Sequence, residues 1–258
     1  MTATQKPLDS PERPSPRSRS HRRRILAAGT ALVVAASTAV FALTLDGSPD
    51  RGPRGNEAVT VTEDPAAAPV DESLLALARR DPSDTLAVGR EDAPVVMIEY
   101  SDFQCPYCGR FARETKPELL RSYVDKGVLR IEWRNFPLFG EESERAALAA
   151  WAAGQQKNFW PFHDVVYAEP RKRNSGQFTT DKLVAMAREA GVPDLDRFRA
   201  DMDSDKAREA IGKDRSEGYA LGVSSTPAFL VNGRPLLGAQ PTDTFVAAIE
   251  AAAKATAK

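Results

Sequence analysis

The two cysteines of this chain stand close together, at Cys105 and Cys108. Residues 94–100 form an apolar run that predicts a buried strand, and residues 109–114 can open a helix. A Cys-x-x-Cys pair between a strand and a helix indicates a dithiol–disulfide site. Unpaired N–H groups and the helix dipole stabilise an anion at a helix start. We therefore expect Cys105 to be exposed, with a lowered pKa, as the attacking sulfur, and Cys108, one turn further along, to be the resolving sulfur.

Other uses of a closely spaced cysteine pair fit the sequence less well. A zinc knuckle needs four ligands, but the chain has no further cysteine, and its histidines are His21, in the basic tail, and His163. Attachment of c-type haem requires a histidine after the second cysteine, where this chain has Gly109. An iron–sulfur site would need cysteines from a second chain. We predict no cofactor and no metal site, with a Cu(I)-binding metallochaperone module as the alternative from another class.

A second motif lies far along the chain, where Thr226-Pro227 precedes the apolar residues 228–231. A proline at the start of a core strand removes a hydrogen-bond donor from the ladder. Either a cis Thr226–Pro227 bond or an ordinary trans proline at the strand start is consistent with this segment. The following Asn232-Gly233 predicts a hairpin turn into a partner strand over residues 234–237.

The remaining pattern predicts the elements that position these motifs. Residues 71–80 predict a short helix, and a long helix should run from the cysteines to about residue 124, kinked by Pro117. The other expected elements are strands at 85–88, 95–101 and 128–133, an inserted helical block at about 141–222, and a last helix from 245 to about 255. This order predicts an α/β domain.

The N-terminal part of the chain has a different character. The 258-residue chain has a net charge of −1, which is no signature for nucleic acid, but residues 1–24 carry seven basic and two acidic residues. Residues 25–45 lack charged side chains and are long enough to cross a bilayer core of ~30 Å. The positive-inside rule then places the N-terminus in the cytoplasm. We predict a disordered tail at 1–24, an uncleaved single-pass anchor at 25–45 in preference to a signal peptide cut near 40–42, a flexible linker at 46–70, and the folded domain at 71–258.

The segments 99–108 and 222–233 together resemble those of DsbA-like thiol:disulfide oxidoreductases of the thioredoxin superfamily. The resemblance covers roughly residues 84–256, and it is closest to membrane-anchored forms from actinobacteria. One departure is Pro106-Tyr107 between the cysteines, where the best-known oxidases have Pro-His. The resemblance implies a thioredoxin fold with an inserted helical block.

The resemblance also assigns roles to residues. Cys105 and Cys108 match the catalytic pair, and Glu99 matches a buried acid that assists proton transfer to and from Cys108. Pro227 matches a cis-proline that faces the disulfide and helps to dock substrate, and Thr226 precedes it. A glutamate in a buried strand is costly to desolvate, so Glu99 should have a perturbed pKa or a partner. The alternative is a Glu99 that faces solvent on a half-exposed strand.

Neighbouring side chains are weaker candidates. Together with Pro106, Tyr107 belongs to the predicted substrate-binding surface, and Phe103, Tyr107 and Trp160 could line an apolar groove. Trp160 and Phe162 fit the core of the helical block better, and His163 is expected to be a packing or surface residue. Asp102 is expected to organise its loop.

The function implied is dithiol–disulfide exchange outside the cytoplasm, with oxidation of cysteine pairs in exported proteins. The expected partners are those proteins, a membrane oxidoreductase that accepts electrons, and the lipid bilayer through residues 25–45. The direction of electron flow depends on tens of millivolts, so a reductase or isomerase on the same scaffold is the alternative.

Overall fold

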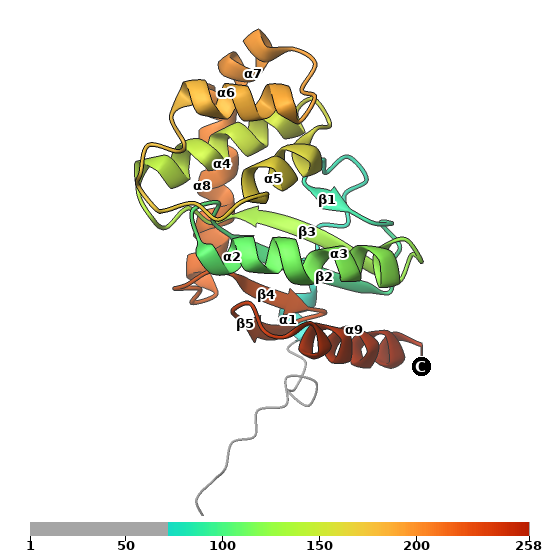
Figure 1. Ribbon diagram of the computed structural model, residues 1–258. Coiled ribbons are helices and arrows are strands. Elements are labelled where there is room, and N and C mark those ends of the chain that lie inside the picture. Colours follow the sequence, from blue (N-terminus) through green and yellow to red (C-terminus); the bar gives the residue numbers. More distant parts are fainter. Residues whose placement is uncertain (1–71, 258) are drawn as a thin grey trace, which may run out of the picture. The chain divides into compact units, whose positions relative to one another are not determined.

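A computed structural model describes residues 72–257 of the chain. They form an α/β domain around one five-stranded sheet, in the order β1-β3-β2-β4-β5 (Figure 1). The strands are β1 (Ala87–Val88), β2 (Val95–Ser101), β3 (Leu129–Asn135), β4 (Ala228–Val231) and β5 (Arg234–Leu237). The predicted strands are thus confirmed, with β1 shorter than expected.

Strand β2 is the centre of this sheet, and every one of its residues is buried. It pairs in parallel with β3 and antiparallel with β4. Burial on both faces explains why its sequence is apolar without alternation. Since Cys105 follows its carboxyl end by four positions, this fully buried central strand positions the two cysteines.

The helical elements cover the sheet and extend beyond it (Figure 1). The segment after the cysteines consists of α2 (Pro106–Arg110), the π-helix η1 (Phe111–Thr115), α3 (Lys116–Leu119) and the π-helix η2 (Leu120–Val124). The inserted block consists of α4 (Glu141–Gly154), α5 (Phe159–Tyr167), α6 (Thr180–Glu189), α7 (Leu195–Met202) and α8 (Asp205–Ala220). The last helix is α9 (Thr242–Thr256). The predicted thioredoxin fold with a helical insertion is confirmed.

Three apolar clusters hold these layers together. One lies between a face of the sheet and the helices η1, α3 and α9, and contains Phe111, Phe229 and Phe245. The opposite face carries Val96, Ile98 and Tyr100 among its buried residues. A third cluster fills the inserted block and continues to Cys105 and Cys108, so the packing of the insertion reaches the cysteines directly.

Buried polar contacts fasten α8 to the sheet. Asp214 accepts a hydrogen bond from the backbone N–H of Asn135 (2.9 Å), and Glu217 accepts hydrogen bonds from Arg134 Nε (3.0 Å) and from the Tyr100 hydroxyl (2.7 Å). These contacts fix the end of α8, from which the chain runs into the Thr226-Pro227 segment.

Two helix predictions need correction. The helix expected at 71–80 is limited to α1 (Glu72–Leu75), and the chain then continues in turns. Arg79 and Arg80 there donate their backbone N–H groups to the buried Glu132 carboxylate, at 3.0 and 2.8 Å, which competes with helical hydrogen bonds. The irregularity expected at Pro117 takes the form of π-helical turns on either side of α3, since a proline lacks the N–H that a regular helix needs.

The predicted tail, anchor and linker (1–24, 25–45 and 46–70) lie outside the described residues. Among residues 72–257, no helix is both long enough and apolar enough to span a bilayer.

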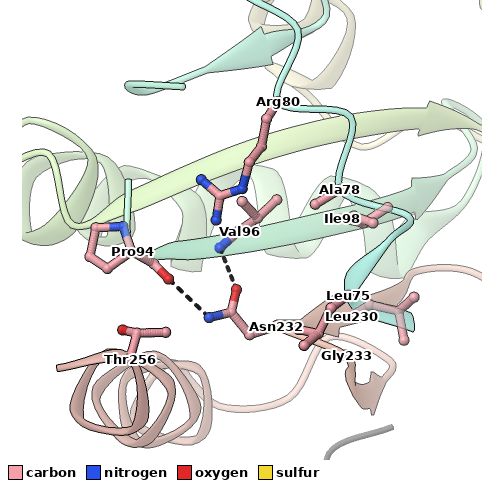
Figure 2. A pocket seen from close by; sticks show the side chains of 10 residues that line it. All are labelled: Leu75, Ala78, Arg80, Pro94, Val96, Ile98, Leu230, Asn232, Gly233 and Thr256. Carbon is pink, nitrogen blue, oxygen red and sulfur yellow. Dashed lines mark hydrogen bonds between the residues drawn. The ribbon is translucent and has the colours of Figure 1, made fainter. Parts of the chain in front are cut away.

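A cavity of about 240 Å³ lies at the start of β2, at the opposite end from the cysteines (Figure 2). At one wall, Asn232 accepts a hydrogen bond from Val96 N–H (2.8 Å) and donates one to the Pro94 carbonyl (3.0 Å). Asn232 and Gly233 both have positive φ, of 43° and 76°, as the predicted hairpin turn requires. The amide of Asn232 thus serves to lock this turn against β2.

Candidate active site

The loop between β2 and α2 is organised by Asp102, as expected. One carboxylate oxygen accepts a hydrogen bond from Gln104 N–H (2.7 Å), and the other accepts one from Leu138 N–H (2.6 Å). Burial raises the pKa of Asp102, and these hydrogen bonds oppose the shift. The carbonyl of Asp102 accepts a hydrogen bond from Cys105 N–H (2.9 Å), so the same residue fixes the backbone of the first cysteine.

Cys105 is the N-cap residue of α2. Its side chain is buried, with 4% of the residue exposed, so the predicted exposure was wrong. The cover comes from a segment more than a hundred positions away, since the Cys105 thiol donates a hydrogen bond to the Thr226 carbonyl at 3.1 Å. A local strand–helix pattern could not reveal this contact.

The pKa of the Cys105 thiol is lowered to about 6, the direction expected from the helix start. The largest cause is the Cys108 thiol, which donates a hydrogen bond to the Cys105 sulfur. The Thr226 hydroxyl and the N–H groups of Cys108 and Tyr107 lower the pKa further. The Thr226 hydroxyl is buried and has no hydrogen-bond partner of ordinary geometry in the described domain, so it is free to donate to a Cys105 thiolate.

Cys108 behaves in the opposite way. It is fully buried, and burial raises the pKa of its thiol well above the ordinary value, with the neighbouring Cys105 adding to the shift. Both cysteines are free thiols in this structure. The pair therefore holds one thiol that ionises readily and one that stays protonated.

Glu99 lies in the middle of β2, where it is opposite Trp133 of β3 and Phe229 of β4. It is completely buried, which excludes the solvent-facing alternative. Burial raises the pKa of Glu99 to about 7. Neither carboxylate oxygen has a hydrogen-bond partner of ordinary geometry among residues 72–257. The site thus contains a buried carboxyl group that exchanges a proton near neutral pH.

Two side chains that the sequence reasoning missed influence Glu99. The Ser101 hydroxyl lowers the pKa of both Glu99 and Cys108, so it lies near both groups. It forms no hydrogen bond of ordinary geometry with the described residues. Because Ser101 is two residues after Glu99 on β2, the strand period of two indicates that they share a face.

The second missed residue is Lys116, whose positive charge lowers the pKa of Glu99. Its buried ammonium group lies 3.0 Å from His163 Nδ1 and 2.5 Å from Asp164 Oδ1, over the ring of Trp160 at 4.8 Å. Burial lowers the pKa of His163 to about 3, so that ring is neutral, in keeping with its expected packing role. Lys116 follows Cys108 by eight residues in the predicted helix, and this spacing could have indicated that both side chains lie on the buried face.

Aromatic side chains form the wall around the pair. Phe103 is buried and stacks on Tyr167, with ring centroids 5.1 Å apart. Phe162 is fully buried in the core of the insertion, as expected, and Trp160 packs against that core. Phe103 and Trp160 are therefore part of the support beneath the cysteines, whereas Tyr107 is 59% exposed beside them.

The predicted substrate-binding residues come together at this site. Pro106 begins α2 and is exposed next to Tyr107. The Thr226–Pro227 bond is cis, as the family resemblance implied, and β4 begins just after it. Within residues 72–257, no cluster of three or more His, Cys, Asp or Glu side chains could hold a metal ion. The geometry suits a dithiol that exchanges with other thiols through Cys105.

Comparison with known proteins decides the family. The thioredoxin family model matches residues 82–251. The probable disulfide bond formation protein D of Bacillus cereus is 33% identical over 151 residues, which cover 57% of this chain and 69% of that protein. The chain belongs to the thioredoxin family, as a DsbA-like thiol:disulfide oxidoreductase. Cys105 and Cys108 form the Cys-x-x-Cys pair of this oxidoreductase.

Solved structures show the same fold for this oxidoreductase. Oxidised BdbD from Bacillus subtilis aligns with a TM-score of 0.62 and 23% identity, over 66% of this chain and 92% of that one. A thioredoxin-like oxidoreductase from Silicibacter pomeroyi aligns with a TM-score of 0.59 and 27% identity, over 71% and 97% of the two chains. The Na⁺/H⁺ antiporter NhaA 1 of Salinispora arenicola is 35% identical over 174 residues, but these are 25% of that protein.

Proposed function

We propose that this oxidoreductase oxidises cysteine pairs in exported proteins, with Cys105 as the attacked sulfur and Cys108 as the resolving one. The observation that carries the proposal is the contrast between the two thiols, since the pKa of Cys105 is about 6 and that of Cys108 is well above its ordinary value. A stabilised thiolate favours the dithiol form of the protein, and that makes its disulfide form an oxidant.

The exchange begins when a substrate thiolate attacks Sγ of Cys105 in the oxidised pair. A mixed disulfide forms, the Cys105–Cys108 bond breaks, and its electron pair goes to Cys108, which takes up a proton. The second substrate thiolate then attacks the substrate sulfur of the mixed disulfide. Cys105 leaves as a thiolate, and the substrate has lost two electrons to the pair.

Glu99 and Ser101 supply the proton that Cys108 needs. The Glu99 carboxyl, with its pKa of about 7, is partly protonated at neutral pH. The Ser101 hydroxyl affects both groups, so it can pass a proton from Glu99 to the Cys108 sulfur. Reoxidation reverses the transfer, and Glu99 receives the proton again.

The surface around Cys105 supplies the substrate contacts. Thr226 and Pro227 cover the Cys105 sulfur on one side, where an extended substrate segment can lie along their backbone. Pro106 and the exposed ring of Tyr107 offer an apolar edge on the other side. Both edges suit unfolded chains, whose apolar side chains are accessible.

The location proposed is the outer side of the cell membrane, with residues 25–45 as a single-pass anchor and the N-terminus in the cytoplasm. The uncharged run after a basic tail supports this. A membrane oxidoreductase is the proposed electron acceptor. A periplasmic thioredoxin-like protein from Salmonella enterica shares the fold, with a TM-score of 0.58.

The test uses the full chain, oxidised beforehand, and a reduced test protein with one cysteine pair. We expect rapid oxidation of the test protein with stoichiometric reduction of the Cys105–Cys108 pair. Cys105→Ser should abolish exchange, and Cys108→Ser should accumulate mixed disulfides. A reduction potential near that of thioredoxin, about −270 mV, would favour the reductase alternative. One bound equivalent of Cu(I) without any exchange would favour the metallochaperone alternative.

A further inference from the structure

A small pocket opens directly beside Cys105, apart from the Thr226-Pro227 side. Its volume is about 50 Å³, and its wall includes Cys105, Gly109, Arg113, Glu169 and Arg171. This is room for a group of a few atoms, since a water molecule occupies ≈ 30 Å³ in the liquid. A group bound here would lie next to the sulfur that exchanges with substrates.

Two arginines give the pocket its chemistry. Arg113 Nη1 donates a hydrogen bond to the Tyr167 carbonyl (2.8 Å), and Arg171 Nη1 donates to the Val166 carbonyl. These carbonyls belong to the last turn of α5, where positive charge is favourable. A guanidinium has five N–H donors, so these contacts hold each arginine in place and leave further donors for a ligand.

The positive charge of this pocket is only partly neutralised. Neither arginine forms an ion pair with the residues of the described domain. Burial lowers the pKa of Arg171, and the nearby charge of Arg113 contributes in the same direction. Glu169, exposed at the pocket rim, opposes both effects but makes no ion pair there.

The backbone at Gly109 makes this arrangement possible. A Cβ atom at this position would lie 2.8 Å from Arg113 Nη1 and 3.2 Å from a ring carbon of Tyr167. Glycine thus lets the Arg113 side chain lie across α2 toward the pocket, one turn from Cys105.

We propose that this pocket binds a carboxylate of the thiol compound that reacts at Cys105. The inference rests on the proposed function, and it adds a substrate preference for cysteines that have an anionic group close by. The carboxylate could belong to an acidic residue next to the substrate cysteine or to a small thiol acid. Both sources present the same planar anion, which matches the guanidinium fork.

The experiment compares substrates with and without a negative charge beside the reacting thiol. The oxidised full-length protein is mixed with dithiol peptides that carry either Asp or Asn beside the first cysteine, and the rate of peptide oxidation is measured. A second pair, mercaptoacetate and its methyl ester, tests a small thiol, and each rate is divided by the fraction of that thiol present as thiolate, because esterification also makes the thiol more acidic. We expect the Asp peptide to react about tenfold faster than the Asn peptide, the factor of one charge-assisted hydrogen bond. A preference in the peptide pair alone assigns the site to protein substrates, and one in the small-thiol pair assigns it to thiol acids.

Matched variants locate the effect. Arg171→Gln and Arg113→Gln should each bring the Asp/Asn rate ratio close to one. Glu169→Gln should increase the ratio. Lys172→Gln removes a charge from the next position, outside the pocket wall, and should keep the ratio. Equal rates for the charged and neutral members of both pairs would overturn the proposal. An Asp/Asn rate ratio that is unchanged in both arginine variants would overturn it as well. Failure to oxidise even the Asn peptide would instead refute the proposed function.

Discussion

Cys105 and Cys108 are the same residue type three positions apart, and their surroundings give them opposite acidities. The thiol of Cys108, the hydroxyl of Thr226 and backbone N–H groups stabilise the Cys105 thiolate, whereas complete burial opposes ionisation of Cys108. A shift of one pKa unit corresponds to about 1.4 kcal/mol between the two protonation states. A few donors therefore suffice to make one sulfur the better leaving group.

At this scale, Thr226→Val should raise the pKa of Cys105. The variant keeps the shape and the backbone carbonyl of Thr226 but removes the hydroxyl that stabilises the thiolate. One lost hydrogen bond of about 1 kcal/mol corresponds to a rise of somewhat less than one unit. The ultraviolet absorbance of the thiolate, followed against pH, measures it. A titration midpoint that stays at about 6 would show that the hydroxyl is not a donor.

Glu99→Gln should change how stability depends on pH. The folded-state pKa of Glu99 is raised from 4.5 to about 7, so the folded protein holds a proton that the unfolded chain has lost between these values. Stability should fall as pH rises through this window, by up to about 3 kcal/mol, and the glutamine variant should not show this loss. Urea unfolding of the reduced protein at several pH values tests it, with the exposed Glu114→Gln as control. Parallel profiles for wild type and Glu99→Gln would contradict the assignment.

The helical segment from α2 to η2 connects the reactive sulfur to the buried charges. Its inner face carries Cys108, Ala112 and Lys116 at intervals of four residues, which brings a positive charge toward Glu99. Burial sets the raised pKa of Glu99, and the charge of Lys116 on this element lowers that pKa in part.

Lys116→Met tests this coupling, since it retains the apolar stem and removes the charge. We expect the pKa of Glu99 to rise above about 7, because the ammonium group no longer favours the carboxylate. The difference in unfolding free energy between Lys116→Met and Lys116→Met/Glu99→Gln, measured against pH, isolates the Glu99 contribution. The pH at the midpoint of this change gives the pKa of Glu99, and a value equal to that of the wild type would mean that Lys116 and Glu99 do not interact.

Helix α8 offers a matched pair of glycines. A Cβ atom at Gly218 would lie 2.5 Å from the Phe136 ring, whereas one at Gly212 meets nothing within 4 Å. Gly218→Ala should destabilise the domain by roughly 1–3 kcal/mol through overpacking, and Gly212→Ala should stabilise it by up to about 1 kcal/mol. Urea unfolding of both variants measures this. Equal effects would show that α8 does not pack closely on Phe136.

For the whole molecule, the acidity of one thiol becomes a redox property. At pH values below the pKa of Cys105, about 6, reduction of the disulfide takes up two electrons and two protons. Above that pKa, it takes up two electrons and one proton. The reduction potential should therefore fall by about 59 mV per pH unit below the break and by about 30 mV above it. Equilibration with glutathione at several pH values measures the slope. A single slope of about 59 mV up to pH 8 would rule out a stable Cys105 thiolate.

The sequence by itself determined the α/β class, the central strand, the reactive pair and the hairpin turn at Asn232. These depend on local patterns, namely the apolar run before Cys105, the spacing of the two cysteines and the turn preference of Asn-Gly. The helical block was recognisable because its apolar periodicity extends over many residues. The resemblance of two short segments to one family added the cis Thr226–Pro227 bond.

Only the tertiary structure decided how Cys105 is covered, which charge faces Glu99 and what lies beside the active sulfur. Thr226, Lys116 and Arg171 reach the site from separate elements, and their contacts depend on how those elements pack. Solvation and electrostatic interactions change steeply over a few ångströms. Local sequence patterns do not encode such distances, so the pair was evident from its spacing, while its acidity and its neighbours were set by the fold.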